Sequence, residues 1–577
     1  MDVANAFVPQ TGADHIAKFI TDRGQKRVYY YPGGTIAALL EGFHKQNMPL
    51  ICARHEQGAG YAALAEAKLS NQAQAVMVSS GPGVTNIVTV VADAYYDSVP
   101  MIFLTGQVGV KDMRKSKKHR QAGFQEVDTA NMLNPIAKQV LVVKQPDDVL
   151  AMLSLAYQIA ESGRKGPVIV DLPMSTQLAE VKKPKALPTL PQPAKPRRLD
   201  QGIQDFVNAY LEFLTQSKRP ILLIGNGVRN ADAMDVVRKL ARLSNIPYTQ
   251  SLPALGILPS KISLTGQSLG YHGHTGNQAA GLALHEADLG LVLGSRLDVR
   301  QTGTLTKKFM PKAKLFQVEL DPAEAQYRRV RKSVLINADL KAIVEAINER
   351  LQDINLPDWQ AWNHELMRFK RNHPLPMGKE GVVTAQRIIH AVDQASSGKK
   401  TIVATGVGSH QQWTARHFNF DAPLRQWLTS AGLGAMGYDL PSAVGAAFAH
   451  KDSMIFCFVG DGSLQMNIQE LATIKEHNLP IKIFCLDNQR LAIVSQFQKT
   501  KWPRDIGCGA KSNPDFAAIA AAYGMRTLTI NNLDGMQRQI QQAIELPGPI
   551  FVHCHIDPDT DISPMLLAGD TLDAMST

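Results

Sequence analysis

Short apolar runs alternate along this chain with longer segments in which apolar residues recur every three or four positions. In the clearest case, an apolar run at 455–459 predicts a buried strand, and helical spacing over 464–474 predicts a helix. A second apolar run at 481–486 predicts another strand. Together they form a right-handed βαβ unit, whose two strands are parallel and end at the same edge of the sheet. Because this alternation recurs throughout the chain, we predict an α/β fold made of doubly wound parallel sheets.

Two proline-containing breaks divide the pattern into three blocks. Residues 181–200 contain five prolines among basic residues, which predicts an extended connector rather than a packed element. A weaker break covers 353–381, where prolines are spaced among charged residues and tryptophans. We therefore predict three domains, each with its own parallel sheet, at 1–184, 201–352 and 381–560.

Composition narrows the class of protein. Of the 577 residues, 45% are hydrophobic and 19% are charged, which is typical of globular domains and excludes a disordered chain. The net charge of +10 suits anionic partners, but no zinc-finger spacing or stacking-aromatic motif accompanies it, so we expect anionic substrates and cofactors rather than nucleic acid. The five cysteines are few and odd in number, which argues against a disulfide framework. With neither a signal-peptide pattern nor an apolar stretch of membrane-spanning length, we expect a cytoplasmic protein that binds no membrane.

Polar residues follow both strands of the βαβ unit. Asp461, between two glycines, directly follows the first strand, and Asn488 follows the second. Because parallel strands end at one edge of the sheet, these two side chains can share one ion. Carboxylate and carboxamide oxygens suit Mg²⁺, and the helix N-terminus beside Asp461 favours phosphate. Gly-Asp-Gly alone is more often an ordinary turn, but the order and spacing of the two clusters predict a Mg²⁺-bound diphosphate.

The order of Gly-Asp-Gly, helix and strand-terminal asparagine resembles the thiamine-diphosphate-binding motif. The resemblance implies that Asp461, Asn488 and the main-chain carbonyl of Arg490 hold the Mg²⁺, and that Gly462 and Ser463 contact the cofactor.

In the first block, Glu56 stands at the turn between a predicted strand and an alanine-rich helix. A carboxylate there ordinarily complements the helix dipole. The surrounding motifs are more specific, and they occur in one order: YPGG, RHEQGAG, SSGPGVTN, DSVP, LTGQV, FQEVD and GPVIVDLP. Together they resemble the acetolactate synthase (acetohydroxyacid synthase) family of thiamine-diphosphate enzymes, and matches continue over nearly the whole chain.

This resemblance implies roles for residues of the first and third blocks. Glu56 would hydrogen-bond the thiamine pyrimidine ring and promote loss of the C2 proton, and Gln125 would lie near the substrate carbonyl. The resemblance also implies that His410 contacts the diphosphate and that Met436 lies beneath the cofactor rings. His410 could equally be a structural histidine, and a methionine is generally commoner in a core than beneath a cofactor. Other implied thiamine-diphosphate contacts are Pro32, Gly33, Val407, Gly408, Ser409, His410, Gly434 and Met436.

The middle block begins with a strand that runs into a Gly-x-Gly turn, which alone is more often a packing turn than a dinucleotide site. Later strand-end loops follow the order of the FAD-binding loops in acetolactate synthase. The resemblance therefore implies a structural FAD that takes no part in electron transfer, although Glu319 stands where aspartate is usual. The implied FAD contacts are Arg164, Gly225, Gly227, His272, Gly294, Arg296, Arg300, Glu319 and Asp339.

We therefore predict an enzyme that decarboxylates pyruvate and transfers the hydroxyethyl carbanion to a second 2-keto acid. Two departures from the family, Met174 for a lysine and Phe497 for a tryptophan, leave open a bulkier acceptor such as a ketone or a nucleotide-linked ketosugar. A second alternative is a flavoenzyme of the pyruvate oxidase type. In related enzymes the cofactor spans two chains, so we expect a homodimer or homotetramer.

Overall fold

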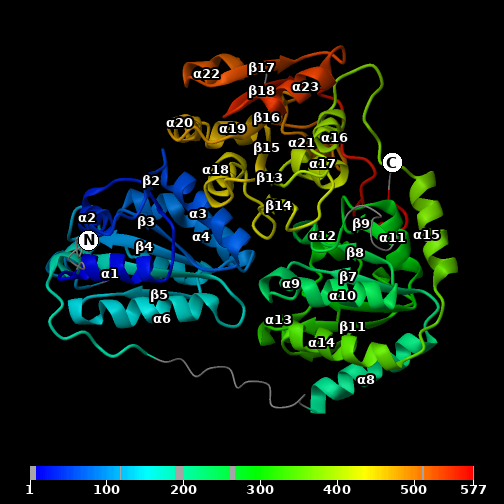
Figure 1. Ribbon diagram of the computed structural model, residues 1–577, viewed down its shortest axis with the longest axis horizontal. Helices are drawn as coiled ribbons and strands as arrows, with labels where there is room; N and C mark the ends of the chain where they lie inside the picture. The colour runs from blue at the N-terminus through cyan, green and yellow to red at the C-terminus, as the bar shows by residue number, and fades with distance from the viewer. Residues whose placement is uncertain (1–7, 117, 189–200, 260–266, 510–512, 576–577) are drawn as a thin grey trace, which may run out of the picture. The chain divides into compact units, whose positions relative to one another are not determined.

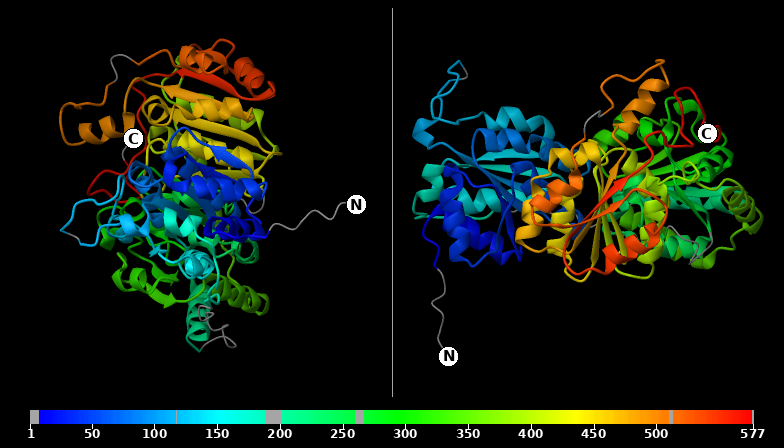
Figure 2. Two further views of the ribbon diagram at one scale, coloured as in Figure 1. Left: turned by 90° about the vertical axis from the view of Figure 1, so that its left-hand side faces the viewer. Right: turned by 90° about the horizontal axis from the view of Figure 1, so that it is seen from above.

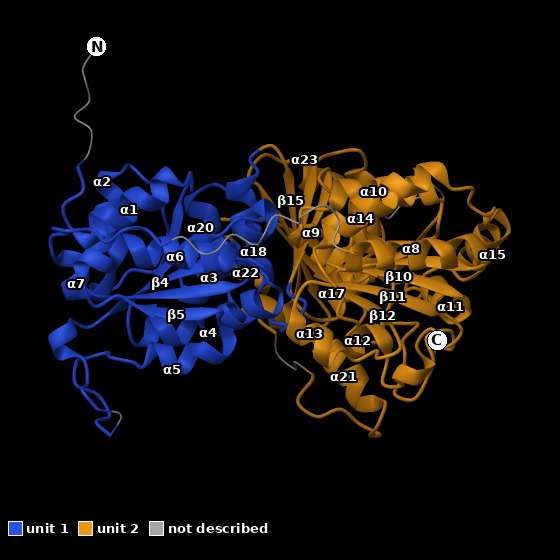
Figure 3. Ribbon diagram, turned by 90° about the horizontal axis from the view of Figure 1, so that it is seen from below, with its two compact units in different colours: residues 1–194, 430–451, 466–479 blue, residues 195–429, 452–465, 480–577 orange. Residues whose placement is uncertain are grey.

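The computed structural model describes residues 8–116, 118–188, 201–259, 267–509 and 513–575 (Figure 1). It contains three six-stranded sheets, in which the strand pairings are parallel. This confirms the predicted α/β class with parallel sheets. The described residues form two compact units (Figure 3). Unit 1 covers the residues up to 188 together with 430–451 and 466–479, and unit 2 covers the others from 201 onward.

The first sheet belongs to unit 1 and has the strand order β2-β1-β3-β4-β6-β5. Its central strands are buried apart from the first residue of β3, as expected for parallel strands covered on both faces. The strands are β1 (Val28–Tyr30), β2 (Leu50–Cys52), β3 (Gln74–Val78), β4 (Met101–Gln107), β5 (Gln139–Val142) and β6 (Pro167–Pro173). The helices are α1 (Gly12–Asp22), α2 (Ala37–Lys45), α3 (Glu56–Ser70), α4 (Pro82–Tyr96), α5 (Thr129–Leu133), α6 (Val149–Glu161) and α7 (Met174–Leu178).

Unit 1 also contains two helices from much later in the chain, α18 (Asp439–Ala449) and α20 (Glu470–Glu476). The helix α18 packs along α3. Gly445 permits this approach, because a Cβ atom there would lie 2.1 Å from the carbonyl oxygen of Ala62. Small residues in both helices therefore bring the two backbones close together.

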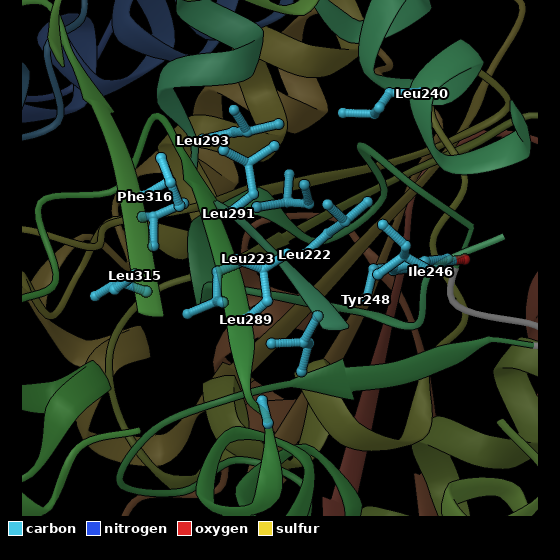
Figure 4. Close-up of a cluster of buried hydrophobic side chains, with 14 of the residues drawn as sticks. Leu222, Leu223, Leu240, Ile246, Tyr248, Leu289, Leu291, Leu293, Leu315 and Phe316 are labelled. Atoms are coloured by element: carbon cyan, nitrogen blue, oxygen red, sulfur yellow. The ribbon is translucent and has the colours of Figure 1, made fainter. Parts of the chain in front are cut away.

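The central sheet belongs to unit 2 and has the order β12-β11-β10-β7-β8-β9. This is the Rossmann strand order. Strands are added outward in both directions from a central pair, here β7 and β10, which are the first and fourth strands of the sheet. Leucines of these two strands fill the core beside the sheet (Figure 4). The strands are β7 (Pro220–Ile224), β8 (Tyr248–Gln250), β9 (Ser268–Tyr271), β10 (Leu289–Leu293), β11 (Lys314–Glu319) and β12 (Val334–Asn337). The helices are α8 (Gln201–Gln216), α9 (Gly227–Asn230), α10 (Met234–Ser244), α11 (Gln278–Glu286), α12 (Val299–Thr302), α13 (Pro322–Tyr327), α14 (Leu340–Arg350) and α15 (Gln360–Asn372).

The third sheet also belongs to unit 2, and its strands run side by side in the order β14-β13-β15-β16-β18-β17 (Figure 2, yellow to red). This repeats the strand order of the first sheet. The strands are β13 (Thr401–Thr405), β14 (Arg425–Thr429), β15 (Met454–Gly460), β16 (Ile481–Asp487), β17 (Arg526–Ile530) and β18 (Ile550–His555). The helices are α16 (Ala385–Ala395), α17 (Ser409–His417), α19 (Asp461–Met466), α21 (Ala492–Lys499), α22 (Phe516–Ala522) and α23 (Met536–Glu545).

Two expectations about local structure need correction. The single helix predicted over 464–474 is two helices, α19 and α20. Between them, Asn467 donates hydrogen bonds to the carbonyl of Gly437 (2.7 Å) and to Gln57 (2.9 Å), so tertiary contacts override the helical spacing. The break predicted at 353–381 contains α15, and residues 189–200 of the predicted connector lie outside the described residues.

No helix within the described ranges is both long and apolar enough to cross a membrane.

Candidate active site

Glu56 is the first residue of α3, directly after the turn that follows β2. Its side chain is almost fully buried, with 7% of its surface exposed. The amide of Asn86, on α4, donates a hydrogen bond of 3.0 Å to Oε2. Among the described residues, none donates to Oε1, so the second oxygen of this oriented carboxylate is available to a ligand.

The loop that begins α4 brings Glu56 and Gln125 to the same place. A Cβ atom added at Gly83 would lie 3.6 Å from Glu56 Oε1, and one added at Gly81 would lie 2.9 Å from Gln125 Cβ. Gln125 has a φ of 64°, which is a strained left-handed conformation for a residue with a side chain. The hydroxyl of Ser80, directly before Gly81, is buried and has no hydrogen-bond partner among the described residues. The loop thus joins the two predicted catalytic side chains and leaves a polar atom for a ligand.

Pro32 and Gly33 lie in the turn after β1, directly beside the turn after β3. A Cβ atom at Gly33 would lie 2.3 Å from the Cβ of Ser79, so only glycine permits this contact. The hydroxyls of Thr35 and Ser79 are 2.8 Å apart and fix the two turns together. These turns flank the point between β1 and β3 where the strand order of the first sheet reverses.

Gly434 and Met436 lie in a loop of unit 1 that spans 430–438. Met436 is only half-buried, which distinguishes it from a core methionine. The Ser430 hydroxyl accepts hydrogen bonds from the amides of Gly434 (3.2 Å) and Ala435 (2.9 Å). It also donates to Asp93 Oδ1 at 3.0 Å, so its hydrogen-bonding capacity is fully used.

Two carboxylates of the first domain therefore hold this loop, and sequence reasoning missed them. Besides Asp93, Asp97 accepts from the amides of Ala431 (3.2 Å) and Gly432 (2.7 Å), and from Lys68 Nζ (2.7 Å). Burial, reinforced by the neighbouring carboxylate of Asp97, raises the pKa of Asp93. Asp93 and Asp97 are four positions apart, a spacing that places two side chains on the same face of a helix. This spacing is the feature of the sequence that could have indicated their shared role.

In unit 2, the predicted metal ligands follow adjacent strands of the third sheet. Asp461 is the first residue of α19, directly after β15, and Asn488 directly follows β16. Both are buried, at 4% and 5% exposure. The guanidinium of Arg490 is bound by Ser495 Oγ, the carbonyl of Pro558 and Asp561, so this residue can offer an ion only its main-chain carbonyl.

A second carboxylate and an amide complete this region. The Asn513 side chain donates to both Asp461 Oδ2 (2.7 Å) and Asp487 Oδ1 (2.9 Å), a bridge that the sequence pattern did not reveal. Burial, opposed by the hydrogen bond from Asn513 and assisted by the nearby carboxylate of Asp487, raises the pKa of Asp461 to about 6. Two buried carboxylates with few cationic contacts suit a bound divalent cation.

The residues predicted to hold a diphosphate lie between β13 and the N-terminus of α17. Ser409 is the first residue of α17, and its buried hydroxyl has no hydrogen-bond partner among the described residues. The ring of His410 fits between glycines, because a Cβ atom at Gly408 or Gly460 would lie 2.7 Å or 3.1 Å from its Nδ1. Val407 precedes them, and Gly462 and Ser463 begin α19 at the next strand end. The N-terminus of α17, which no side chain caps, and the unpaired hydroxyl of Ser409 fit an anionic phosphate group.

Four predicted FAD contacts lie at the carboxyl edge of the central sheet, where β12, β11, β10 and β7 are neighbours. Gly225 and Gly294 pack against each other at the reversal point, since a Cβ atom at Gly225 would lie 2.1 Å from the Gly294 carbonyl oxygen. The glycines therefore have a packing role of their own. The four contacts are Gly225, Gly294, Glu319 and Asp339, of which Asp339 also caps α14.

The other predicted FAD residues are more dispersed. Gly227 begins α9, and Arg300 lies in α12, whose N-terminus Asp298 caps. The Nη2 atom of Arg296 lies 3.7 Å from Oδ2 of Asp298. His272 is buried between Thr249 and Gln301, and burial lowers its pKa to about 4, so it is neutral. Arg164 belongs to unit 1, where its Nε donates to Ser98 at 2.9 Å.

Comparison with known proteins agrees with this arrangement. Three family models match the chain: the thiamine pyrophosphate enzyme N-terminal TPP-binding domain at 10–132, the central domain at 207–347 and the C-terminal TPP-binding domain at 406–554. The acetolactate synthase isozyme 1 large subunit of Escherichia coli K12 is 37% identical over 565 residues, covering 97% of this chain and 96% of that protein.

Relatives from other organisms show similar identity and coverage. The acetolactate synthase large subunit of Haemophilus influenzae is 33% identical over 572 residues, with 98% of each chain covered. The chloroplastic acetolactate synthase 1 of Zea mays is 34% identical over 587 residues, covering 97% of this chain and 88% of that protein. Since similarity extends over all three sheets, the chain belongs to the acetolactate synthase family of thiamine pyrophosphate-dependent enzymes.

Proposed function

We propose that this enzyme decarboxylates pyruvate and ligates the two-carbon unit to a second 2-keto acid, forming acetolactate when both are pyruvate. Membership of the acetolactate synthase family supports this activity. The observation that carries it within the chain is the buried Glu56, which Asn86 orients and which one glycine loop joins to Gln125.

Thiamine diphosphate, when bound, supplies the nucleophilic carbon that attacks the pyruvate carbonyl. Glu56 Oε1 would hold the proton shared with the pyrimidine ring nitrogen, and Asn86 keeps the carboxylate in place. A buried, dry position strengthens this hydrogen bond and keeps water from the reacting groups. Gln125, held in its strained conformation against Gly81, would present its amide to the substrate carbonyl.

Unit 2 supplies the groups for the charged end of the cofactor. Asp461, Asn488 and the Arg490 carbonyl would hold Mg²⁺. The N-termini of α17 and α19 and the Ser409 hydroxyl would hold the diphosphate, through Val407, Gly408, Ser409, His410, Gly462 and Ser463.

Unit 1 supplies the groups for the ring end of the cofactor. Pro32 and Gly33 would line the pyrimidine side. Met436, half-buried on its docked loop beside Gly434, would support the rings from below. Because Ser430 and the carboxylates of Asp93, on α4, and Asp97, directly after it, fix this loop, the support is rigid.

We also propose that FAD binds along the carboxyl edge of the central sheet. The Rossmann strand order and the glycine-lined reversal point at Gly225, Gly227 and Gly294 support this site. The remaining contacts would be Arg164, His272, Arg296, Arg300, Glu319 and Asp339. The flavin would be structural, because decarboxylation and ligation together transfer no net electrons, so anaerobic pyruvate should leave its absorption spectrum unchanged.

Oligomeric state, domain bounds and location complete the proposal. We expect a homodimer or homotetramer in which Glu56 of one chain and Asp461 of another serve one cofactor. Mixing inactive Glu56→Gln and Asp461→Ala chains should then restore part of the activity, and no recovery after confirmed subunit exchange would contradict shared sites.

We propose the domain bounds 1–184, 201–352 and 381–560. We also propose a cytoplasmic location, which the free thiols of all five cysteines support.

Incubating the purified protein with pyruvate, thiamine diphosphate, Mg²⁺ and FAD tests the activity directly. The proposal expects prompt formation of acetolactate from pyruvate alone. Turnover that requires an added ketone or ketosugar would contradict the second 2-keto acid as acceptor. Flavin bleaching at the rate of turnover would instead indicate an oxidase.

A further inference from the structure

A second group of metal-ligating side chains lies at the carboxyl end of β16 and β18. These strands are parallel neighbours, with Cys485 opposite His553 and Asp487 opposite His555. Because alternate residues of a strand point to the same face, Asp487, His553 and His555 share one face of the sheet. One ligand atom from each lies within 4.8 Å of those of the other two.

The environment of this cluster favours ligation over solvation. Asp487 and His553 are both 3% exposed, and their Oδ2 and Nε2 atoms are 2.9 Å apart. Ligands of one ion, at about 2.0–2.2 Å from it, lie roughly 3.0–3.5 Å from each other, so the pair at 2.9 Å needs to separate only slightly to admit an ion. His555 is exposed and can rotate toward the pair.

Groups outside the cluster hold its members in the orientation that an ion requires. Asn513 donates to Oδ1 of Asp487, on the side away from His553. Asp515 Oδ1 lies 3.8 Å from Nδ1 of His553. When an ion takes the Nε2 position, the ring proton therefore moves to Nδ1 and faces a carboxylate, the usual support for a metal-bound histidine.

We propose that Asp487, His553 and His555 bind one divalent transition-metal ion of the Zn²⁺, Co²⁺ or Ni²⁺ type. Two imidazoles and one carboxylate suit these ions. Mg²⁺ prefers oxygen ligands, so it would not compete for this site at moderate concentrations. The site is distinct from that of Asp461 and Asn488, and it goes beyond the proposed function.

The two sites are linked by one side chain. Asn513 donates to Asp461 and Asp487 together, so an ion at the histidine site fixes the group that orients the other carboxylate. Transition-metal binding should therefore change the Mg²⁺ dependence of thiamine-diphosphate retention, and Mg²⁺ should change transition-metal affinity by the same factor.

Titration with Co²⁺ tests the proposal, because a Co²⁺ ion bound to histidine absorbs visible light. The full-length protein, stripped with a chelator and then saturated with Mg²⁺, should bind one equivalent of Co²⁺ with a visible spectrum. His555→Gln, at an exposed position that does not endanger folding, should weaken this binding by at least about 10-fold. Asp487→Asn should weaken it similarly.

His373→Gln serves as the matched control, since His373 is exposed and lies on the unrelated helix end after α15. It should leave the affinity for Co²⁺ unchanged. The proposal is overturned if the parent protein binds no Co²⁺ beyond that removed by washing, or if the spectrum survives both His555→Gln and Asp487→Asn. Either result leaves the Mg²⁺ site and the proposed activity unaffected, so the two failures are distinguishable.

Discussion

The first and third sheets have the same strand order, yet they present different chemistry at the same positions. In each sheet, the order in which strands are added reverses between the first and third strands, which are β1 and β3 or β13 and β15. Glycine turns follow both strands of each pair. In the first sheet, Gly33 packs against Ser79 across this point, and in the third, Gly408 and Gly460 pack around His410. The shared topology explains why both sheets form a ligand edge, and the side chains decide which part of a ligand each one takes.

The difference is clearest where the fourth and sixth strands of each sheet, β4 and β6 or β16 and β18, are neighbours. In the first sheet, Gln107 donates to Asp171 at 3.2 Å, and Thr105 donates to the same carboxylate at 2.7 Å. In the third sheet, the pair is Asp487 and His553. Neutral donors satisfy the carboxylate of the first sheet, whereas the third gathers acidic and imidazole groups that suit cations.

The two carboxylates at helix N-termini differ in the same way. Asp461 has a second carboxylate nearby and shares Asn513 with it, an arrangement that a cation would stabilise. Glu56 instead has the amide of Asn86 on one oxygen. We therefore propose that the third sheet binds the charged end of the cofactor and that the first sheet handles the proton.

The largest expected effect comes from removing the third-sheet carboxylate. Asp461→Ala should weaken metal-dependent cofactor retention by at least about 100-fold, because changes outside the ligand shell alone cost roughly 10–100-fold. Equilibrium dialysis with thiamine diphosphate and Mg²⁺ measures this loss. Asp452→Ala, at an exposed position just before β15, is the control and should bind normally. Unchanged retention of thiamine diphosphate in Asp461→Ala would show that this carboxylate of the third sheet does not bind the metal ion.

Glu56→Gln should have the next largest effect, on turnover rather than on binding. Glutamine keeps the size of the side chain but cannot exchange a proton, so turnover should fall by roughly 10²–10⁴-fold. Cofactor affinity should change only modestly. Steady-state kinetics at saturating cofactor measure the effect, with Glu41→Gln on the exposed face of α2 as control. A loss confined to cofactor affinity would make both carboxylates binding groups and abolish the contrast.

A smaller effect is expected from loosening the Met436 loop. Ser430→Ala removes the hydrogen bond that holds the loop on Asp93 and two hydrogen bonds within the loop, so the supporting side chain should move by a fraction of an ångström. Turnover should fall about 10-fold, less than the roughly 100-fold that a displacement of about 1 Å can cost. The Michaelis constant for pyruvate should change less than turnover. Equal activity of Ser430→Ala and the exposed control Ser397→Ala would show that this loop needs no such anchor.

The smallest predicted effect concerns the pH dependence of stability. Burial raises the pKa of Asp171 to about 6 from its ordinary value of 3.8. The folded protein therefore binds this proton more tightly, so the stabilisation is fully present below 3.8 and is lost as the pH rises through about 6. Asp171→Asn should reduce the drop in melting temperature between about pH 5 and pH 8 by a few degrees at most. An identical fall in melting temperature in both proteins would show that ionising Asp171 in the folded protein does not reduce its stability.

Sequence patterns predicted the parts of this molecule that depend on neighbours in the chain. Strand ends, glycine turns and the positions of Glu56, Asp461 and Asn488 at them follow from local hydrophobic spacing and parallel topology. The anchor of the Met436 loop did not follow, because Ser430 and Asp93 are 337 positions apart. Asn513 was missed for the same reason, since its role lies in bridging two carboxylates that reach it only in the folded sheet.

The most direct test of the division between the two sheets is exchange of the C2 proton of bound thiamine diphosphate for deuterium. Measured by NMR after acid quench, exchange in Glu56→Gln should be slower than in the parent protein by roughly 10²–10⁴-fold, with the cofactor still bound. Exchange as fast as in the parent protein, at equal cofactor occupancy, would contradict the account by showing that Glu56 does not handle the proton.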